Sequence, residues 1–179
     1  MAWITGDKVR LRAWERDDIR LRWEADQTDD ATEVSLRDWH EPPRSLDQRL
    51  QEFDAALAEP DAAVVALIIE AEGRVVGDIN LFEIDQRNRR SAIGLSIWSP
   101  ADRNKGYGTD AMRALLRWAF SELNLHRIEL SVDPANAPAI HVYEKLGFRR
   151  EGCRREAHFA GGRYIDDLQM GLLRDEFNA

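Results

Sequence analysis

The chain has 179 residues, 44% of them hydrophobic and 32% charged, which suits one compact domain that buries most of its apolar surface. No run approaches the ~20 apolar residues of a membrane span, and the first residues lack the pattern of a signal peptide. A net charge of −8 disfavours nucleic acid as the main partner and mildly favours a cationic substrate. With a single cysteine, Cys153, no internal disulfide can form, so we expect a cytoplasmic protein. The length predicts a single domain over residues 1–179.

The N-terminal part predicts a strand and two helices. Residues 8–13 alternate apolar and basic side chains, as a strand does. Asp17 can cap a first helix. After a polar stretch over residues 26–44, Ser45 and Gln48 have the spacing of a capping box. The second helix then has four apolar residues on one face: Leu46, Leu50, Phe53 and Leu57.

The middle of the chain predicts three neighbouring strands. Residues 62–69 are continuously apolar, which is typical of a strand buried on both faces, and residues 74–82 return as its hairpin partner. The third strand, over residues 92–98, has one face of large residues: Ile93, Leu95 and Ile97. Its other face has only small ones: Ala92, Gly94 and Ser96. A glycine inside a strand often marks the close approach of another backbone or a ligand.

The C-terminal half alternates helices and strands. Residues 107–123 predict an amphipathic helix, residues 127–132 a strand and residues 136–146 a short helix. Two final strands are expected over residues 148–157 and 163–173. On the long helix four polar residues lie opposite the apolar face: Asp110, Arg113, Arg117 and Glu122. Hairpins followed by a strand–helix–strand–helix unit indicate a mixed, three-layer α/β sheet.

A glycine-rich turn over residues 103–109 precedes the long helix. Gly106 and Gly108 allow a turn that exposes free backbone N–H groups at the positive end of the helix dipole, which favours anion binding. Arg103, Lys105 and the hydroxyl of Thr109 add further donors. The alternative is a tight strand-to-helix connection with solvated basic residues. The turn lacks the glycine spacing of a dinucleotide fingerprint and of a phosphate-binding loop.

Three ordered motifs resemble those of the GNAT N-acetyltransferase superfamily. Arg103-x-x-Gly-x-Gly108 before an amphipathic helix is similar to the pyrophosphate motif of the family. The segment from Asn136 to Phe148 is similar to its second cofactor segment. Residues 151–173 resemble the Rim-type branch, which includes ribosomal-protein alanine, spermidine and some antibiotic acetyltransferases. The resemblance implies an α/β, three-layer GNAT-like fold, in which about four helices flank a mixed, mostly antiparallel sheet of about seven strands.

The resemblance also implies an acetyl-CoA site. The strand over residues 92–98 would pair with the pantetheine arm around Ile97 and Trp98, in a slot left where it splays from the strand over residues 127–132. Asn136 would hydrogen-bond the pantetheine or acetyl region. The pyrophosphate would be held by the glycine-rich turn, formed by Arg103, Asn104, Lys105, Gly106, Tyr107, Gly108 and Thr109.

Acetyl transfer to an amine requires two proton movements and an oxyanion donor. A leaving thiolate, of free pKa near 8.5, benefits from an acid, and Tyr143 matches the position where many GNAT enzymes have a tyrosine beside the sulfur. The alternative is that Tyr143 only completes the apolar face of its helix. A backbone N–H near Ile97 would stabilise the tetrahedral oxyanion. The Rim-type branch often has a serine where this chain has Ala139, so Tyr143 is available for the acid role and a ribosomal substrate is less expected.

The general base and the acceptor site are less determined. Glu83 ends its strand and either faces the slot, as a base or a substrate contact, or is solvated. His158 is expected on the substrate side, where a free pKa near 6.5 suits a base, but it is also an ordinary surface histidine. The acidic stretch containing Glu33 either attracts a cationic amine or is a solvated loop, and Trp39 either stacks on the substrate or holds that loop.

The sequence therefore predicts an enzyme that transfers an acetyl group from acetyl-CoA to a primary amine by direct attack in a ternary complex. The expected acceptors are a small polyamine, an aminoglycoside-like amine or a protein N-terminus. The alternative is a catalytically idle acyl-CoA-binding module on the same scaffold. No metal, nucleic acid or membrane is expected as a partner, and a homodimer is compatible with the family.

Overall fold

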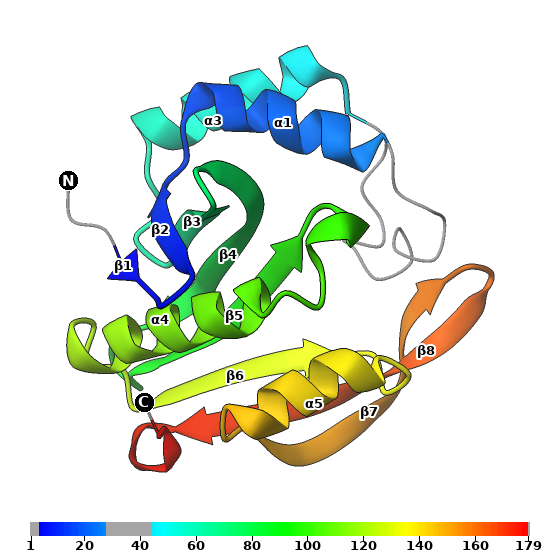
Figure 1. The fold of residues 1–179 in the computed structure, drawn as a ribbon. Helices are drawn as coiled ribbons and strands as arrows, with labels where there is room; N and C mark the ends of the chain where they lie inside the picture. The colour runs from blue at the N-terminus through cyan, green and yellow to red at the C-terminus, as the bar shows by residue number, and fades with distance from the viewer. Residues whose placement is uncertain (1–3, 28–43, 179) are drawn as a thin grey trace.

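The computed structural model describes residues 4–27 and 44–178, which form an eight-stranded sheet between two helical layers (Figure 1). The strands are β1 (Ile4–Thr5), β2 (Val9–Ala13), β3 (Val65–Ala71), β4 (Arg74–Asp85), β5 (Arg90–Ile97), β6 (Arg127–Val132), β7 (Arg149–Ala160) and β8 (Arg163–Leu173). The α-helices in these ranges are α1 (Arg16–Asp26), α3 (Leu46–Ala58), α4 (Tyr107–Ser121) and α5 (Ala137–Lys145). The predicted fold class is confirmed; the additional strand, β1, has only two residues, too few for a periodic pattern.

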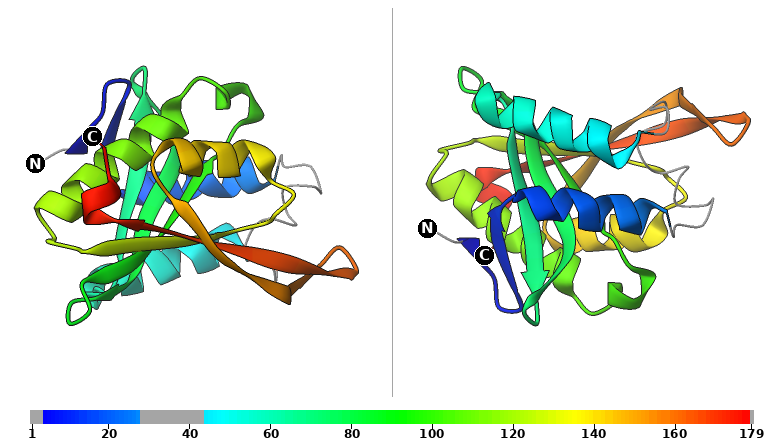
Figure 2. Two further views of the ribbon diagram at one scale, coloured as in Figure 1. Left: turned by 90° about the horizontal axis from the view of Figure 1, so that it is seen from below. Right: turned by 90° about the horizontal axis from the view of Figure 1, so that it is seen from above.

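The strand order is β1-β2-β3-β4-β5-β6-β8-β7, and only the β5–β6 pair is parallel. Figure 2 shows α1 and α3 together on one face of the sheet and α4 and α5 on the other. It also shows the tip of the β7–β8 hairpin projecting beyond the rest of the molecule. The parallel pair arises because α4 crosses over between β5 and β6, and this crossover positions the start of α4 beside the end of β5.

The predicted apolar face of α4 lies at the centre of the core. Ala111, Leu115, Leu116 and Ala119 are all fully buried there. Asp110 is predicted on the solvent face of the helix, but it is only 6% exposed. Its carboxylate accepts hydrogen bonds from the backbone N–H groups of Asp7, Lys8 and Val9 and so ties the start of β2 to α4.

The starts of α1 and α3 test the two capping predictions. The N-cap of α1 is Glu15, so the prediction for Asp17 is wrong. Asp18 sits at the third helical position instead, where its buried carboxylate accepts the Glu15 N–H at 2.7 Å and pairs with Arg12 at 2.6 Å. The capping box of α3 is confirmed, with the Gln48 N–H donating to the Ser45 hydroxyl at 3.2 Å.

Two further predictions, of a buried face on α3 and of a strand over residues 62–69 buried on both faces, are confirmed only in part. Leu46, Leu50 and Phe53 of α3 are half-buried, but Leu57 is 63% exposed and belongs to no packed face. Strand β3 begins at Val65 rather than at residue 62, and only Ile68 and Ile69 are fully buried on their opposite faces. These ends of the elements lie at the surface, where the apolar pattern continues beyond the core.

Candidate active site

Strands β5 and β6 separate after a short paired segment. Their parallel register holds only from Arg90↔Arg127 to Ala92↔Glu129, although β5 continues to Ile97. The other edge of β5 stays bonded to β4 as far as the Gly77↔Ile97 pair. The splay implied by the resemblance is therefore present, and it leaves one backbone edge of residues 93–97 without a strand partner.

The backbone direction at the end of β5 suits this slot. The Trp98 N–H donates to the Val76 carbonyl of the preceding β4 edge at 3.0 Å. Because successive N–H groups of a strand point to opposite edges, the Ile97 N–H points away from β4, towards the splay. This is the direction that the expected oxyanion donor needs. Leu95 and Ile97 are half-buried, whereas Ile93, nearer the paired segment, is buried.

The side chain of Trp98 makes its contacts with β4 and α1. Its ring is 5% exposed, its indole N–H donates to Asp78 at 2.5 Å, and the Arg22 guanidinium lies 5.4 Å from the ring centroid. The backbone N–H is bonded to Val76, so both N–H groups of Trp98 are used within the fold. A direct cofactor contact from Trp98 remains a prediction.

The glycine-rich turn enters α4 through left-handed backbone. Asn104 has φ 61° and Gly106, the N-cap residue of α4, has φ 85°. The first helical N–H with an acceptor inside the helix is that of Asp110, bonded to the Gly106 carbonyl, so the preceding amides of the first turn stay free for an anion. At Gly108 an added Cβ would lie 3.3 Å from Leu95, which shows how closely α4 approaches the slot.

The turn is anchored by a carboxylate that the sequence analysis missed. Asp102, 4% exposed, accepts two hydrogen bonds from Arg74 at 2.7 and 2.6 Å and one from Lys105 at 3.0 Å. The Arg74 hydrogen bonds lower the pKa of Asp102 to about 2, so it is ionised at neutral pH. Lys105 thus anchors the turn through Asp102, and its ammonium also lies 5.8 Å from the Tyr107 ring centroid. A contact from Lys105 to an anion remains a prediction.

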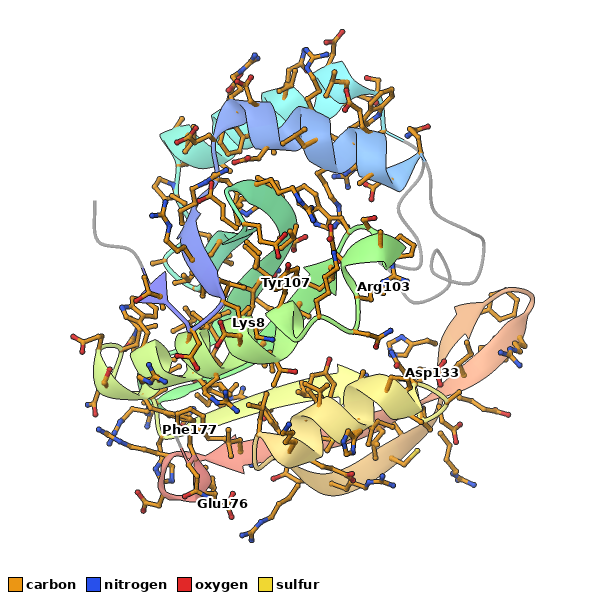
Figure 3. All side chains as sticks on the ribbon, viewed as in Figure 1. Lys8, Arg103, Tyr107, Asp133, Glu176 and Phe177 are labelled. Carbon is orange, nitrogen blue, oxygen red and sulfur yellow. The ribbon has the colours of Figure 1, made fainter. Side chains whose placement is uncertain are left out.

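The remaining side chains of the turn have different roles. The Tyr107 hydroxyl donates to Glu72 at 2.7 Å and its ring is buried, so only its backbone is available to an anion. The Arg103 guanidinium lies 3.5 Å from the Ile97 carbonyl and so connects the turn to the end of β5. Figure 3 shows Arg103 beside the end of β5, while Lys8 and Tyr107 lie near the start of α4. Thr109 is half-buried at the first turn of the helix.

Asn136 and Tyr143 lie on α5 as predicted. Asn136 is the N-cap residue, and its carboxamide oxygen accepts the Ala139 N–H at 3.2 Å, which leaves the amide NH₂ available to donate to a ligand. The Tyr143 ring packs on the core with its centroid 6.0 Å from that of Phe148. Burial raises the pKa of the Tyr143 hydroxyl above its ordinary value near 10. Its hydroxyl makes no hydrogen bond to another described residue.

The two residues predicted as the general base, Glu83 and His158, lie in different parts of the structure. Glu83 is exposed, has φ 53° and lies in a bulge just past Phe82, which pairs with Ala92. It is therefore at the end of the slot where the strands are paired, five residues of strand (roughly 16 Å) from the level of Ile97. A base role for Glu83 remains a prediction.

His158 lies on the β7–β8 hairpin. Its Nε2 is 3.2 Å from a carboxylate oxygen of Asp167, which is 2% exposed and is also paired with Arg154 at 2.6 Å. Asp167 precedes Leu168, the partner of Val132 at the open end of β6. His158 is thus on the open side of the slot, and its base role is likewise untested. Glu33 and Trp39 lie outside the residues that the structure describes.

A sheet opened between two parallel strands, beside a helix start with free amides, can accept a long acyl donor that ends in phosphates. That is the architecture of an acyl-CoA-dependent transferase. A model of the Acetyltransferase (GNAT) domain family matches residues 8–149. The chain belongs to this family and is an acetyl-CoA-dependent N-acetyltransferase.

Several similar proteins are named as N-acetyltransferases. The spermidine N(1)-acetyltransferase of Escherichia coli K12 is 32% identical over 172 residues, which cover 96% of this chain and 89% of the relative. A crystal structure of spermidine N-acetyltransferase from Vibrio cholerae, in complex with CoA and spermine, superposes with a TM-score of 0.85 at 29% identity and covers 96% of this chain and 98% of that one. The putative ribosomal N-acetyltransferase YdaF of Bacillus subtilis is 34% identical over 106 residues, covering 59% of this chain and 57% of the relative.

None of the described helices is long and apolar enough to cross a membrane. Over residues 4–27 and 44–178, no three His, Cys, Asp or Glu side chains gather as the ligands of a metal ion would.

Proposed function

We propose that the chain acetylates a primary amine of a small polyamine, by direct attack of the amine on acetyl-CoA in a ternary complex. The observation that carries this proposal is the slot between β5 and β6, which leads to the free amides at the start of α4. Acetyl-CoA supplies the acetyl group as a thioester. The pantetheine arm is expected along residues 93–97, and the pyrophosphate at the turn formed by residues 103–109.

Different residues would carry out the two proton movements. A phenol with a raised pKa stays protonated at neutral pH, so Tyr143 can hold a proton for a leaving thiolate, whose free pKa is near 8.5. The Ile97 N–H is the proposed donor to the oxyanion. Glu83, His158 or an intervening water would remove the proton of the amine. The amide NH₂ of Asn136 is free to orient the pantetheine because only its oxygen is used by the cap.

A polyamine is the acceptor that the observations support best. The chain carries a net charge of −8, which attracts a substrate with several positive charges. The relatives from E. coli and V. cholerae, which match almost the whole chain, are named for spermidine. An aminoglycoside and a protein N-terminus are the other acceptors with this chemistry, the latter in view of the ribosomal relative.

A thiol-release assay with a panel of acceptors tests the proposal. The panel contains spermidine, spermine, an aminoglycoside and peptides with free N-termini, each at several concentrations with saturating acetyl-CoA. We expect the highest kcat/KM for a polyamine. A higher kcat/KM for a peptide or an aminoglycoside would reject the polyamine. Binding of acetyl-CoA without thiol release from any acceptor would favour the idle binding module.

The same proposal includes self-assembly and a cytoplasmic location. The V. cholerae enzyme has also been solved in a dodecameric form, with a TM-score of 0.80 and 29% identity to this chain, which supports a homo-oligomer. The thiol of Cys153 is exposed and forms no disulfide, as is common in a reducing compartment. Light scattering of the purified protein at several concentrations tests the assembly.

A further inference from the structure

The hairpin turn between β3 and β4 contacts the glycine-rich turn, although the bonded residues are 28 to 35 positions apart in the sequence. Glu72 and Gly73 form this hairpin turn, with φ 53° and 76°, and Ala71 and Arg74 pair on its two sides. Positive φ at both central residues is typical of the tight hairpin turns that match the twist of the strands. The side chains of Glu72 and Arg74 therefore start from a well-defined backbone.

Both of these side chains bind residues in or beside the glycine-rich turn. The Tyr107 hydroxyl donates to Glu72 at 2.7 Å, and Tyr107 is the first residue of α4. Arg74 donates two hydrogen bonds to Asp102, at 2.7 and 2.6 Å, and Asp102 directly precedes the glycine-rich turn. The hairpin turn thus holds the glycine-rich turn at two points without being part of it.

The same contacts balance the charge beside the glycine-rich turn. Asp102 is 4% exposed, and a carboxylate next to an anion-binding turn would repel the anion. Arg74 and Lys105 both donate to it, the second at 3.0 Å. The hydrogen bonds to Asp102, and to a smaller extent the charge of Glu72, raise the pKa of Arg74 above its ordinary value. Two carboxylates and two cations leave the cluster neutral, so loss of Arg74 would leave one negative charge in excess.

We propose that Arg74 is a positioning residue of the enzyme, which masks the charge of Asp102 and fixes the glycine-rich turn so that its amides can accept a pyrophosphate. The inference rests on the proposed use of acetyl-CoA. The role requires no contact between Arg74 and the cofactor. The guanidinium is instead bonded to Asp102 through two N–H groups, the geometry in which arginine binds a carboxylate most strongly.

Calorimetric titration of CoA into Arg74→Gln tests the inference. The Arg74 side chain is 48% exposed, so this variant should fold. Relative to the native protein we expect CoA affinity to fall about 5- to 20-fold at about 0.05 M salt and less than about 3-fold at about 0.5 M salt, because salt screens the unmasked charge. The KM for acetyl-CoA should rise with the dissociation constant, while kcat at saturation changes less than about 2-fold.

Two further variants separate the charge from the fold. Arg74→Gln combined with Asp102→Asn removes the unmasked charge and should return CoA affinity to within about 3-fold of the native value. Arg74→Lys keeps the positive charge and should lose less affinity than Arg74→Gln does. A purely structural role of the ion pair predicts the opposite for the double variant, because it removes both partners and recovers no contact.

Arg16→Gln is the matched control. Arg16 of α1 also donates two hydrogen bonds to a carboxylate, that of Asp54, and α1 lies on the opposite face of the sheet from α4 (Figure 2). The control changes the net charge by the same amount and should bind CoA as the native protein does. Native affinity in Arg74→Gln, an equal loss at both salt concentrations or no recovery in the double variant would overturn the role of Arg74. Failure of the native protein to bind CoA would instead overturn the proposed donor.

Discussion

Burial of the Tyr143 ring has a chemical consequence at its hydroxyl. A phenol held in an apolar environment ionises less readily, so its pKa is raised above the ordinary value near 10. The neutral form is therefore present throughout the neutral range and is lost only as the pH rises through this raised pKa. A proton donor for a thiolate needs this behaviour. The same burial is expected if Tyr143 only packs in the core. A substitution that keeps the ring but removes the hydroxyl distinguishes the acid role from the packing role.

Tyr143→Phe keeps the ring and its contact with Phe148 but removes the proton. We expect kcat to fall about 10²-fold or more, within the range of a lost general acid, while the dissociation constant for acetyl-CoA changes less than about 3-fold. Steady-state thiol release and calorimetry measure the two quantities. Tyr164→Phe, at a tyrosine 64% exposed, is the control. An unchanged kcat would leave Tyr143 with only its packing role.

Asn136 combines a structural and a proposed binding role in one side chain. Asn136→Ser keeps an oxygen that caps α5 but lacks the NH₂ donor, whereas Asn136→Ala loses both. We expect Ala to lower the free energy of unfolding by about 1 kcal/mol and Ser by only a few tenths. Both should raise the KM for acetyl-CoA by a similar factor. A native KM in the serine variant would confine Asn136 to capping.

At the scale of the elements, the contact between β4 and the end of β5 shapes the slot. The two strands approach so closely that a Cβ at Gly77 would lie within 3.2 Å of several backbone atoms of Ser96 and Ile97. The backbone of β5 cannot move away freely, because α4 packs against its other face through Gly108 and Leu95. The close contact at Gly77 therefore fixes the position of the Ile97 N–H.

Gly77→Ala should displace the end of β5. We expect a loss of about 2–3 kcal/mol in unfolding free energy, as for overpacking in a rigid core, together with weaker acetyl-CoA binding. Urea denaturation and calorimetry measure the two effects. Gly152→Ala is the control, since a Cβ there would meet no atom within 4 Å. Equal stabilities of the two variants would show that the strands separate easily.

At the scale of the whole molecule, the charge of −8 should act on the acceptor over a distance longer than any contact. Salt screens such a field within about 10 Å at 0.1 M. With acetyl-CoA saturating, we expect the KM for spermidine to rise several-fold between 0.02 and 0.5 M salt, and the KM for a monoamine to rise less. Initial rates of thiol release give both values. An equal rise in KM for the two amines would mean that the charge of the protein does not favour an acceptor with several positive charges.

What the sequence by itself determined is local. The glycine-rich turn, the amphipathic α4, the capping box of Ser45 and the placement of Asn136 and Tyr143 on one helix follow from backbone preferences and periodicities within a few residues. Each of these signals is encoded by neighbours along the chain, and the resemblance to the GNAT superfamily rested on the same local segments.

Only the tertiary structure decided the partners of the polar side chains and the opening of the sheet. Lys105, Trp98 and Asp110 are engaged by residues that fold next to them, such as Asp78 for Trp98 and the start of β2 for Asp110. Nothing in the sequence of β5 or β6 states how many residues of the two strands pair. The register of a parallel pair is set by the crossover helix and the packing around it, so the slot exists only once the whole sheet is assembled.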